Sequence, residues 1–344
     1  MHLRGNFELA AAAGISIGAL AVYELASKSS SFRRWLNDYM DPMILIGTVG
    51  ELHIHPIKSS RSHMVSEAFC SEVGLRCGEL RDRYFVIING DTKIALTALN
   101  IPRVVLIETA IKDNKLTMTG QQADPTTIDL NAVAQKANVV RVSCKGKQIE
   151  GLDCGDTAGA WLQQFLESTE PLRLLYFWPG LFSERQVIVD KNWEFIAVPY
   201  RKDEVAYPNR TPYMALSQAS LDDLNSKFDS QKYEMRNFRP NIVVVGCPAY
   251  DEDLWNEVRI GDHAKFVCVR ACIRCPITTI NPNTAEKAVD GEPLKTLKEY
   301  RQPPGEAQAQ KKEWPVLGVQ MGLDEAGVIK VGDPVYVRYK KFPH

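Results

Sequence analysis

Cys268, Cys272 and Cys275 lie close together in the sequence and are the first candidates for chemistry. Their Cys-x3-Cys-x2-Cys spacing could hold an iron–sulfur cluster, because soft thiolate ligands suit such clusters. The surrounding segment 265–280 argues against a cluster, because its alternating pattern predicts a strand with Cys268 and Cys272 on one face. Cysteines buried in a core strand are therefore an equal alternative.

Cys275 differs from its neighbours because it lies between Arg274 and Pro276. Proline interrupts the hydrogen bonding of a strand, so we expect Cys275 to face a cavity rather than the interior of a sheet. A nearby guanidinium favours the thiolate, which is the form that acts as a nucleophile or binds a metal. Of the three cysteines, Cys275 is therefore the one best suited to chemistry.

Basic residues gather at loop-like positions in several short segments. Each one alone is more typical of a surface charge or an ion pair. Together they would suit a phosphate-bearing anion, since arginine offers a bidentate fork and lysine a point charge. These residues are Lys58, Arg81, Arg83, Arg239 and Arg274.

His53 and His55 end a predicted strand with one residue between them. Two imidazoles in this pattern can bind one metal pair, but such a site needs further histidines and a catalytic aspartate in the right order. The chain has only six histidines, and two of these are His2 and the terminal His344. We therefore expect His53 and His55 to be exposed residues at the end of a strand.

The elements that must position these residues are mostly strands. Short β-rich runs are bounded by Gly, Pro, Asn or Asp, which predicts a strand-dominated α/β fold, a β-barrel with helices packed outside it. The polar, proline-containing stretch 282–314 is expected to be a surface excursion. The expected strands cover residues 44–56, 84–89, 104–109, 174–178, 241–245, 264–280 and 334–339.

Two segments have apolar residues at helical spacing. The first covers residues 157–168 and follows Asp156, which is expected to cap it. The second covers residues 217–228, and its Ser220 is followed three residues later by Asp223, as at a capping box. Both helices are expected to pack against the outside of the barrel.

The N-terminus contains an uncharged run over residues 9–23, bounded by Glu8 and Glu24. A membrane span needs about 20 apolar residues, so this run is marginal. It fits either a cleaved secretory signal peptide or an uncleaved anchor whose basic C-terminal flank stays in the cytosol. The residues alone leave these two alternatives even, and the two glutamates argue against a matrix transit peptide.

The composition excludes several classes of protein. The chain has 344 residues, 45 % of them hydrophobic, with 41 basic side chains against 42 acidic ones. Collagen-like, disordered and polytopic membrane proteins differ from this composition. The near-neutral charge gives no general reason to expect nucleic acid as a partner, although a local basic pocket can lie within a neutral total. Eight cysteines are too few for a disulfide scaffold.

Six short motifs occur in a fixed order over about residues 45–340. They are Pro56-Ile57-Lys58-Ser59, Gly78-Glu79-Leu80-Arg81-Asp82-Arg83, Asn237-Phe238-Arg239-Pro240-Asn241, Arg274-Cys275 with Thr278-Thr279, Glu292-Pro293-Leu294 through Tyr300-Arg301, and Val331-Gly332-Asp333-Pro334-Val335. In this order they resemble the MOSC-domain proteins, and most closely the mitochondrial amidoxime-reducing components.

The resemblance implies an enzyme with a molybdenum cofactor, Mo-molybdopterin. In this family a pterin dithiolene and one cysteine thiolate hold the molybdenum. The family reduces N-hydroxylated compounds such as amidoximes and hydroxylamines, and nitrite is a further expected substrate. Electrons come from NADH through cytochrome b5 reductase and cytochrome b5. The family is anchored in the outer mitochondrial membrane with its catalytic part facing the cytosol, which favours an anchor helix at the N-terminus.

The resemblance also implies individual roles. Cys275 matches the catalytic metal ligand, whereas Cys272 matches a neighbour that is not a ligand. Leu99 stands where an arginine is expected, and residues 207–212 lack the acidic residue expected near Asn209, which puts substrate preference in doubt. The residues implied to contact the cofactor, with Cys275, are Lys58, Ser59, Arg83, Asn209, Arg210, Thr211, Arg239, Ile273, Arg274 and Gln320.

The expected organisation is a β-barrel-type MOSC domain with an associated α+β N-terminal MOSC region. Residues 45–83 are expected to join the cofactor site, which makes 84–184 an insertion. Two other functions stay open: a sulfur carrier that forms a persulfide on Cys275, or a protein that binds the cofactor without turnover. The expected boundaries are 1–44 for the anchor and linker, 45–184 for the N-terminal MOSC region and 185–344 for the MOSC domain.

Overall fold

The computed structural model of the chain describes residues 41–184, 205–230, 232–302 and 314–340. The predicted anchor run at 9–23 lies outside these ranges. Within them, no helix has both the length and the apolar character needed to cross a membrane.

A closed barrel of seven strands forms the centre of the fold. Its strands are β1 (Ile44–Ile54), β13 (Tyr213–Ser217), β14 (Ile242–Val245), β15 (Trp255–Ile260), β16 (Ala264–Ile273), β17 (Val316–Glu325) and β19 (Pro334–Tyr339). Their order is β14-β13-β17-β16-β15-β19-β1, and β1 pairs again with β14 to close the barrel. Large buried side chains such as Trp255, Phe266 and Tyr213 fill the interior, which explains why these strands close around one core.

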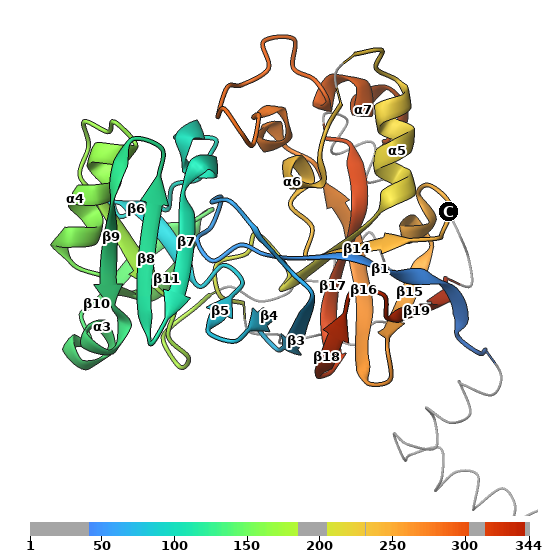
Figure 1. Ribbon diagram of the computed structural model, residues 1–344, viewed down its shortest axis with the longest axis horizontal. Helices are drawn as coiled ribbons and strands as arrows, with labels where there is room; N and C mark the ends of the chain where they lie inside the picture. Colours follow the sequence, from blue (N-terminus) through green and yellow to red (C-terminus); the bar gives the residue numbers. More distant parts are fainter. Residues whose placement is uncertain (1–40, 185–204, 231, 303–313, 341–344) are drawn as a thin grey trace, which may run out of the picture. The chain divides into compact units, whose positions relative to one another are not determined.

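Strands from the N-terminal part of the chain complete the C-terminal half. Figure 1 shows the blue β1 among the orange and red strands, and β2 (His63–Val65) pairs with β1. A separate sheet has the order β18-β3-β4-β5, so the early strands also pair with a late one. Its strands are β3 (Glu67–Ser71), β4 (Gly74–Cys77), β5 (Leu80–Arg81) and β18 (Gly327–Lys330).

Residues 84–184, here called the N-terminal region, have their own core. Helix α4 packs there through Trp161 and Phe165, whose rings stack with centroids 4.9 Å apart. One sheet has the order β10-β11-β12-β6, and another has the order β7-β8-β9. The elements are β6 (Phe85–Asn89), η1 (Pro102–Leu106), β7 (Glu108–Lys112), β8 (Lys115–Gly120), β9 (Ala123–Asp129), α3 (Leu130–Lys136), β10 (Val139–Cys144), β11 (Lys147–Asp153), α4 (Asp156–Phe165) and β12 (Leu172–Tyr176).

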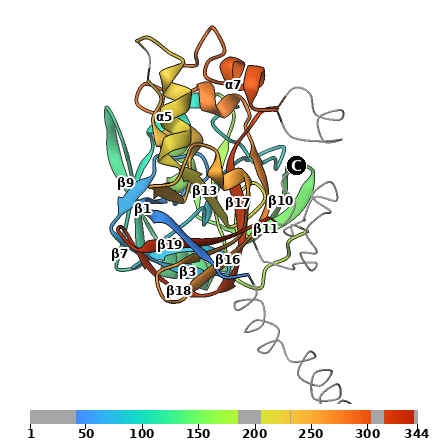
Figure 2. The same ribbon diagram turned by 90° about the vertical axis from the view of Figure 1, so that its right-hand side faces the viewer.

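Short helices cover one end of the barrel. They are α5 (Gln218–Ser226), α6 (Met235–Phe238), η3 (Asp251–Asp253), η4 (Pro276–Thr279) and α7 (Leu294–Tyr300). Helices α5 and α6 lie between β13 and β14, which run parallel and therefore need a crossover connection. Both views show α5 and α7 side by side at the same end (Figures 1 and 2), and Leu221, Leu224 and Leu297 join them in one apolar cluster.

The strand-dominated fold predicted from the sequence is confirmed, with two corrections to its strands. The first half of the strand expected over 104–109 belongs to the 3-10 helix η1, because Pro102 at the start of η1 favours a helical turn, and strand β7 begins only at Glu108. The strand expected over 264–280 ends at Ile273, and Pro276 begins the 3-10 helix η4. Proline has no N–H for the ladder, so pairing cannot continue through this position.

The helix boundaries also differ from those predicted. Helix α5 is capped by Ser217, whose hydroxyl accepts the Ser220 N–H, and not by Ser220. Gly155, rather than Asp156, is the N-cap of α4. The stretch 282–314 is more than a surface excursion, since it contains α7, whose Leu297 is fully buried.

A change of register in β16 corrects the prediction that Cys268 and Cys272 share a face. The pairing with β17 shifts between Cys268 and Arg270, where one extra residue enters β16. Because side chains alternate along a strand, this bulge turns the later residues to the other face. Cys268 packs inside the barrel, whereas Cys272 packs in the apolar cluster under the helices.

Candidate functional site

A cavity of about 490 Å³ opens where the barrel, the loop after β1 and the N-terminal region meet. All eleven residues that the family resemblance implies for the site lie on its wall, and no aspartate or glutamate of the described ranges does. The wall residues anticipated from the sequence are Lys58, Ser59, Arg83, Asn209, Arg210, Thr211, Arg239, Ile273, Arg274, Cys275 and Gln320.

Cys275 lies just beyond the end of β16 and caps the start of η4. Its carbonyl accepts hydrogen bonds from the N–H and the hydroxyl of Thr278, both at 3.1 Å, which fix the turn that carries the thiol. Cys275 is half-buried, whereas Cys272 on the same wall is buried and lies 3.6 Å from the Gln320 Nε2 that donates to it. The more accessible thiol is therefore that of Cys275.

Lys58 supplies one buried cation of the wall. Its ammonium donates to the Tyr207 carbonyl at 2.6 Å and to Asn209 Oδ1 at 2.7 Å. Both acceptors are neutral oxygens, and these contacts fix the direction of the lysine side chain. Asn209 and Arg210 themselves are exposed, and the Thr211 hydroxyl donates to the Tyr213 carbonyl at 2.8 Å.

Arg274 is clamped by backbone carbonyls. Its Nε donates to the Leu317 carbonyl and its Nη1 to the Phe238 carbonyl, each at 2.8 Å. The guanidinium also lies over the Phe238 ring, 5.5 Å from its centroid. Burial lowers the pKa of Arg274 below its usual value. The backbone acceptors therefore fix the direction of this cation beside Cys275.

Arg83 and Arg239 form a second cationic pair on the wall. Both have left-handed backbone conformations, with φ of 52° and 57°. Arg83 Nη2 donates to the Arg239 carbonyl at 3.1 Å, and its Nη1 contacts Asp82. Arg239 Nη2 is buried and has no hydrogen-bond partner. Burial and repulsion by Arg83 lower the pKa of Arg239 to about 9, and the charge of Asp82 only partly opposes this.

Four basic side chains of the cavity could hold a phosphate-bearing ligand. They are Lys58, Arg83, Arg239 and Arg274, here called the cationic wall. Guanidinium groups bind phosphate through paired hydrogen bonds, and the ammonium adds a point charge. Arg81 was grouped with these cations in the sequence, but it lies outside this cavity and stacks on Tyr84, 5.3 Å from the ring centroid.

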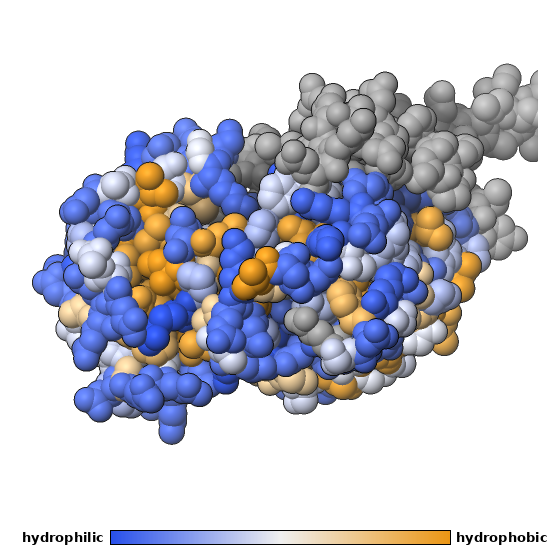
Figure 3. Space-filling model, turned by 90° about the horizontal axis from the view of Figure 1, so that it is seen from above, coloured by the Kyte–Doolittle hydropathy of each residue, from blue (hydrophilic) through white to orange (hydrophobic). Residues whose placement is uncertain are grey.

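Part of the cavity rim comes from the N-terminal region, where the sequence singled out only the segment around Leu99, as a departure that bears on substrate preference. Thr97, Leu99 and Lys145 line this part of the rim. Leu99 is 48 % exposed, and Lys145 occupies a tight turn between β10 and β11 with φ of 52°. Seen from above, the N-terminal region carries a group of hydrophobic side chains on its surface (Figure 3). The departure at Leu99 was the one signal in the sequence that pointed to this rim.

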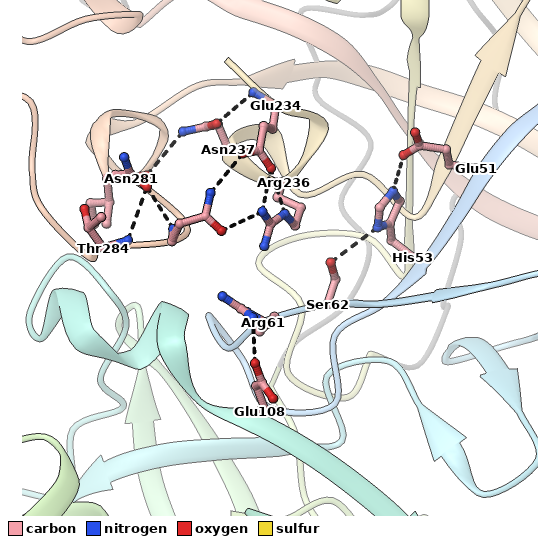
Figure 4. A network of polar contacts seen from close by, with 12 residues as sticks. Glu51, His53, Arg61, Ser62, Glu108, Glu234, Arg236, Asn237, Asn281 and Thr284 are labelled. Carbon is pink, nitrogen blue, oxygen red and sulfur yellow. Dashed lines mark hydrogen bonds and ion pairs between the residues drawn. The ribbon is translucent and has the colours of Figure 1, made fainter. Parts of the chain in front are cut away.

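His53, near the end of β1, and His55, just after it, are buried and not exposed as predicted from their position at a strand end. His53 Nε2 lies 2.7 Å from Glu51 and its Nδ1 lies 3.3 Å from the Ser62 hydroxyl (Figure 4). Burial and the charges of Arg239 and Arg83 hold the pKa of His55 well below its usual value. Across the described ranges, no three histidine, cysteine or acidic side chains group as metal ligands would.

Comparisons with known proteins place the chain in a family. Residues 46–169 match the MOSC N-terminal beta barrel domain and residues 202–336 match the MOSC domain, so both halves define a MOSC-domain protein. The chain is 38 % identical over 325 residues to mitochondrial amidoxime-reducing component 1 of Mus musculus, covering 94 % of this chain and 92 % of the relative. It is also 38 % identical to mitochondrial amidoxime reducing component 2 of Bos taurus, over 85 % of this chain and 83 % of that one.

The chain therefore belongs to the family of the mitochondrial amidoxime-reducing components, as its sequence motifs predicted. Among solved structures, the YuaD protein of Bacillus subtilis is similar over 85 % of this chain and 96 % of its own, at 10 % identity and a TM-score of 0.35.

Proposed function

We propose that this chain is a molybdenum-cofactor-dependent reductase of N-hydroxylated compounds, with amidoximes and hydroxylamines as its substrates and nitrite as a further one. The observation that carries the proposal is the accessible thiol of Cys275 on a wall with several buried cations and, among the residues that the structure describes, no acidic side chain. The names of its relatives support the same reaction.

The residues present fit the cofactor. Arg239 Nη2 is a buried donor without a partner, which suits the phosphate of a pterin cofactor. The Cys275 thiolate is a soft, electron-donating ligand that suits molybdenum. The remaining cationic wall would balance the cofactor's negative charge, and Ser59, Thr211 and Gln320 would offer polar contacts to the ring system.

The reaction divides between the cofactor and the chain. When bound, the molybdenum cofactor supplies the two electrons that, with two protons, convert an N–OH group into N–H and water. Cys275 would hold the metal, and the cationic wall would orient the cofactor. Thr97, Leu99 and Lys145 line the same cavity and would contact the part of the substrate that does not react.

The family relationship supports a proposal for the electron donors and the location. We propose that NADH supplies electrons through cytochrome b5 reductase and cytochrome b5, at the outer mitochondrial membrane, with the catalytic part in the cytosol. The relatives are named mitochondrial, and the apolar run 9–23 supports an anchor.

We also propose a division into domains. An anchor and linker would occupy 1–44, the N-terminal MOSC region 45–184 and the MOSC domain 185–344. The pairing of β1 with β14 and of β3 with β18 supports the contribution of residues 45–83 to the cofactor site.

The test compares two neighbouring thiols on the same wall. The wild-type chain, produced in a host that makes the cofactor, is expected to hold about one molybdenum per chain and to reduce benzamidoxime with a chemical electron donor. Cys275→Ser is expected to abolish the reduction and to lose molybdenum, whereas Cys272→Ser retains both. Equal losses in the two variants would show that Cys275 is wrongly assigned.

The same preparations distinguish the alternatives. Molybdenum without turnover would indicate a protein that only binds the cofactor. A persulfide on Cys275 in a chain without molybdenum would indicate a sulfur carrier. Both outcomes would contradict the proposed reductase.

A further inference from the structure

Asp82 is a buried carboxylate that lies behind the cavity but does not line it. It follows β5 and is 1 % exposed. Its Oδ1 accepts the His55 N–H at 2.8 Å and lies 3.4 Å from His55 Nδ1, while its Oδ2 accepts from Arg83 Nη1. The proposed reaction assigns no role to this carboxylate, although it touches a residue of the cationic wall.

The contacts of Asp82 continue through Arg83 to Arg239. Arg83 Nη2 donates to the Arg239 carbonyl at 3.1 Å. The backbone of Arg83 is held as well, because its N–H donates to the His55 carbonyl at 2.7 Å and its carbonyl accepts the Tyr207 N–H at 3.0 Å. With the backbone and the guanidinium both fixed, Arg83 can in turn fix the turn that carries Arg239.

The charges in this group favour an ionised Asp82. Burial by itself would raise the pKa of Asp82, but the charge of Arg83 and the hydrogen bonds from His55 outweigh it and lower the pKa. Without the carboxylate, the guanidiniums of Arg83 and Arg239 would repel each other in a poorly solvated setting. Asp82 therefore both orients Arg83 and offsets the repulsion between the two arginines.

We propose that Asp82 is a positioning residue for anion binding in the cavity: it holds Arg83, and through Arg83 the backbone of Arg239, so that the unpartnered Arg239 Nη2 is presented to a phosphate group. The identity of that phosphate as the cofactor's rests on the proposed function. The positioning itself rests on the contacts of Asp82, Arg83 and Arg239.

Asp82→Asn separates positioning from simple charge. The variant makes the group more positive, so electrostatics alone would bind an anion more tightly. If Asp82 positions the arginines, the variant binds the anion more weakly in spite of the added positive charge. The two explanations therefore predict opposite signs.

The experiment measures binding of inorganic phosphate to the full-length chain without cofactor, by calorimetry at low ionic strength. Asp82→Asn is expected to weaken binding at least about tenfold, as loss of a charge-assisted hydrogen bond would. Asp153→Asn is the matched control, because Asp153 is also a buried carboxylate paired with an arginine, but its partner Arg173 does not line the cavity as Arg83 does. The affinity of the Asp153→Asn variant for phosphate is expected to stay within about twofold of wild type.

A second pair of variants tests whether Asp82 acts through Arg83 and does not depend on Asp82→Asn being folded. Arg83→Gln removes the cation, and Asp82→Asn/Arg83→Gln replaces the whole ion pair with neutral groups. If Asp82 acts through Arg83, the double variant binds phosphate as tightly as Arg83→Gln alone. A further loss of about tenfold in the double variant would overturn the proposal.

The outcomes separate this inference from the proposed function. Phosphate binding by Asp82→Asn as tight as wild type, or tighter, would overturn the positioning role alone. Absence of phosphate binding to the wild-type chain would also overturn it. Absence of molybdenum from the wild-type chain made in a competent host would instead contradict the proposed function, whatever the phosphate measurements show.

Discussion

At the scale of single residues, Glu252 shows how burial controls a charge outside the cavity. It is fully buried in η3, and both its oxygens accept the Ser220 hydroxyl, at 2.8 and 3.0 Å. Burial raises the pKa of Glu252 from its ordinary 4.5 to about 7, and the hydrogen bonds from Ser220 only partly oppose this. Between pH 4.5 and about 7, the folded chain therefore keeps a proton on Glu252 that the unfolded chain has released.

We expect Glu252 to make stability depend on pH. Because the pKa in the folded chain is raised, its contribution is fully present below pH 4.5 and is lost as the pH rises through about 7. Glu252→Gln should remove this loss, so its advantage in free energy of unfolding over wild type should grow by roughly 3 kcal/mol between pH 4.5 and 8. Denaturant unfolding at several pH values measures this.

Glu299→Gln is the control for Glu252, since Glu299 is exposed on α7. Its stability relative to wild type should stay constant over the same range of pH. A Glu252→Gln curve parallel to that of wild type would show that burial does not hold the proton there.

At the scale of elements, β17 depends on a glycine that allows Arg274 to approach. Gly318 has φ of +78°, a conformation that L side chains rarely adopt. A Cβ there would lie 2.7 Å from the Ala215 carbonyl oxygen and 3.2 Å from Arg274 Nη2. The preceding residue, Leu317, offers the carbonyl that clamps Arg274. The backbone of β17 thus helps to position one cation of the wall.

Gly318→Ala is expected to destabilise the chain by at least about 2 kcal/mol and to displace Arg274. The physical reason is the combination of backbone strain with a clash against backbone oxygen. Thermal unfolding measures the loss of stability. The molybdenum content of protein from a host that makes the cofactor measures the effect of displacing Arg274.

Gly332→Ala separates the effect of backbone strain from that of a steric clash. Gly332 also has a positive φ, 93°, but a Cβ there would meet nothing within 4 Å. We expect this variant to lose about 1 kcal/mol and to keep its molybdenum. Equal effects of the two substitutions would mean that the contact with Arg274 has no importance.

At the scale of the whole molecule, the site depends on closure of the barrel by β1. Val49 and Leu52 of β1 pair with β14, and the Val49 N–H donates to the Asp333 carbonyl at 2.9 Å. The loop after β1 carries Lys58 to the cavity. Removing β1 would therefore expose two strand edges and also take away part of the cationic wall.

A chain that begins at residue 84 is expected to be largely insoluble, because β14 and β19 would lose their partner. A chain that begins at residue 41 keeps the compact unit Leu45–His344 and is the matched control. The soluble fraction and the elution volume in gel filtration measure the outcome. A soluble, compact protein from residue 84 onward would show that the barrel does not need β1.

Much of the fold follows from local patterns. The strand predicted at 334–339 has the observed bounds, because a Gly-Asp turn precedes it and apolar residues alternate along it. The helix at 217–228 was found from its apolar spacing, but its cap was misplaced by three residues. Local rules identify an element more reliably than its ends, since flanking contacts decide where each end falls.

Some residues of the candidate site could likewise be predicted from the sequence, and others could not. The resemblance pointed to eleven residues that line the cavity, from Lys58 to Gln320. The departure at Leu99 also bore on the substrate, but nothing in the sequence pointed to Lys145, because its approach to the cavity depends on how the N-terminal region packs. Nor did it show that Asp82 is buried between His55 and Arg83, since a charged residue in a loop-like motif is ordinarily exposed.

The sequence by itself determined the family, the strand-rich fold class and the choice of Cys275, because these depend on residue types in order along the chain. Only the tertiary structure decided which side chains meet. One extra residue in β16 sends Cys268 and Cys272 to opposite faces, and closure by β1 brings Lys58 to the cavity that Cys275 lines. Such outcomes depend on pairing between distant segments, whose register is set by the packing of the whole core.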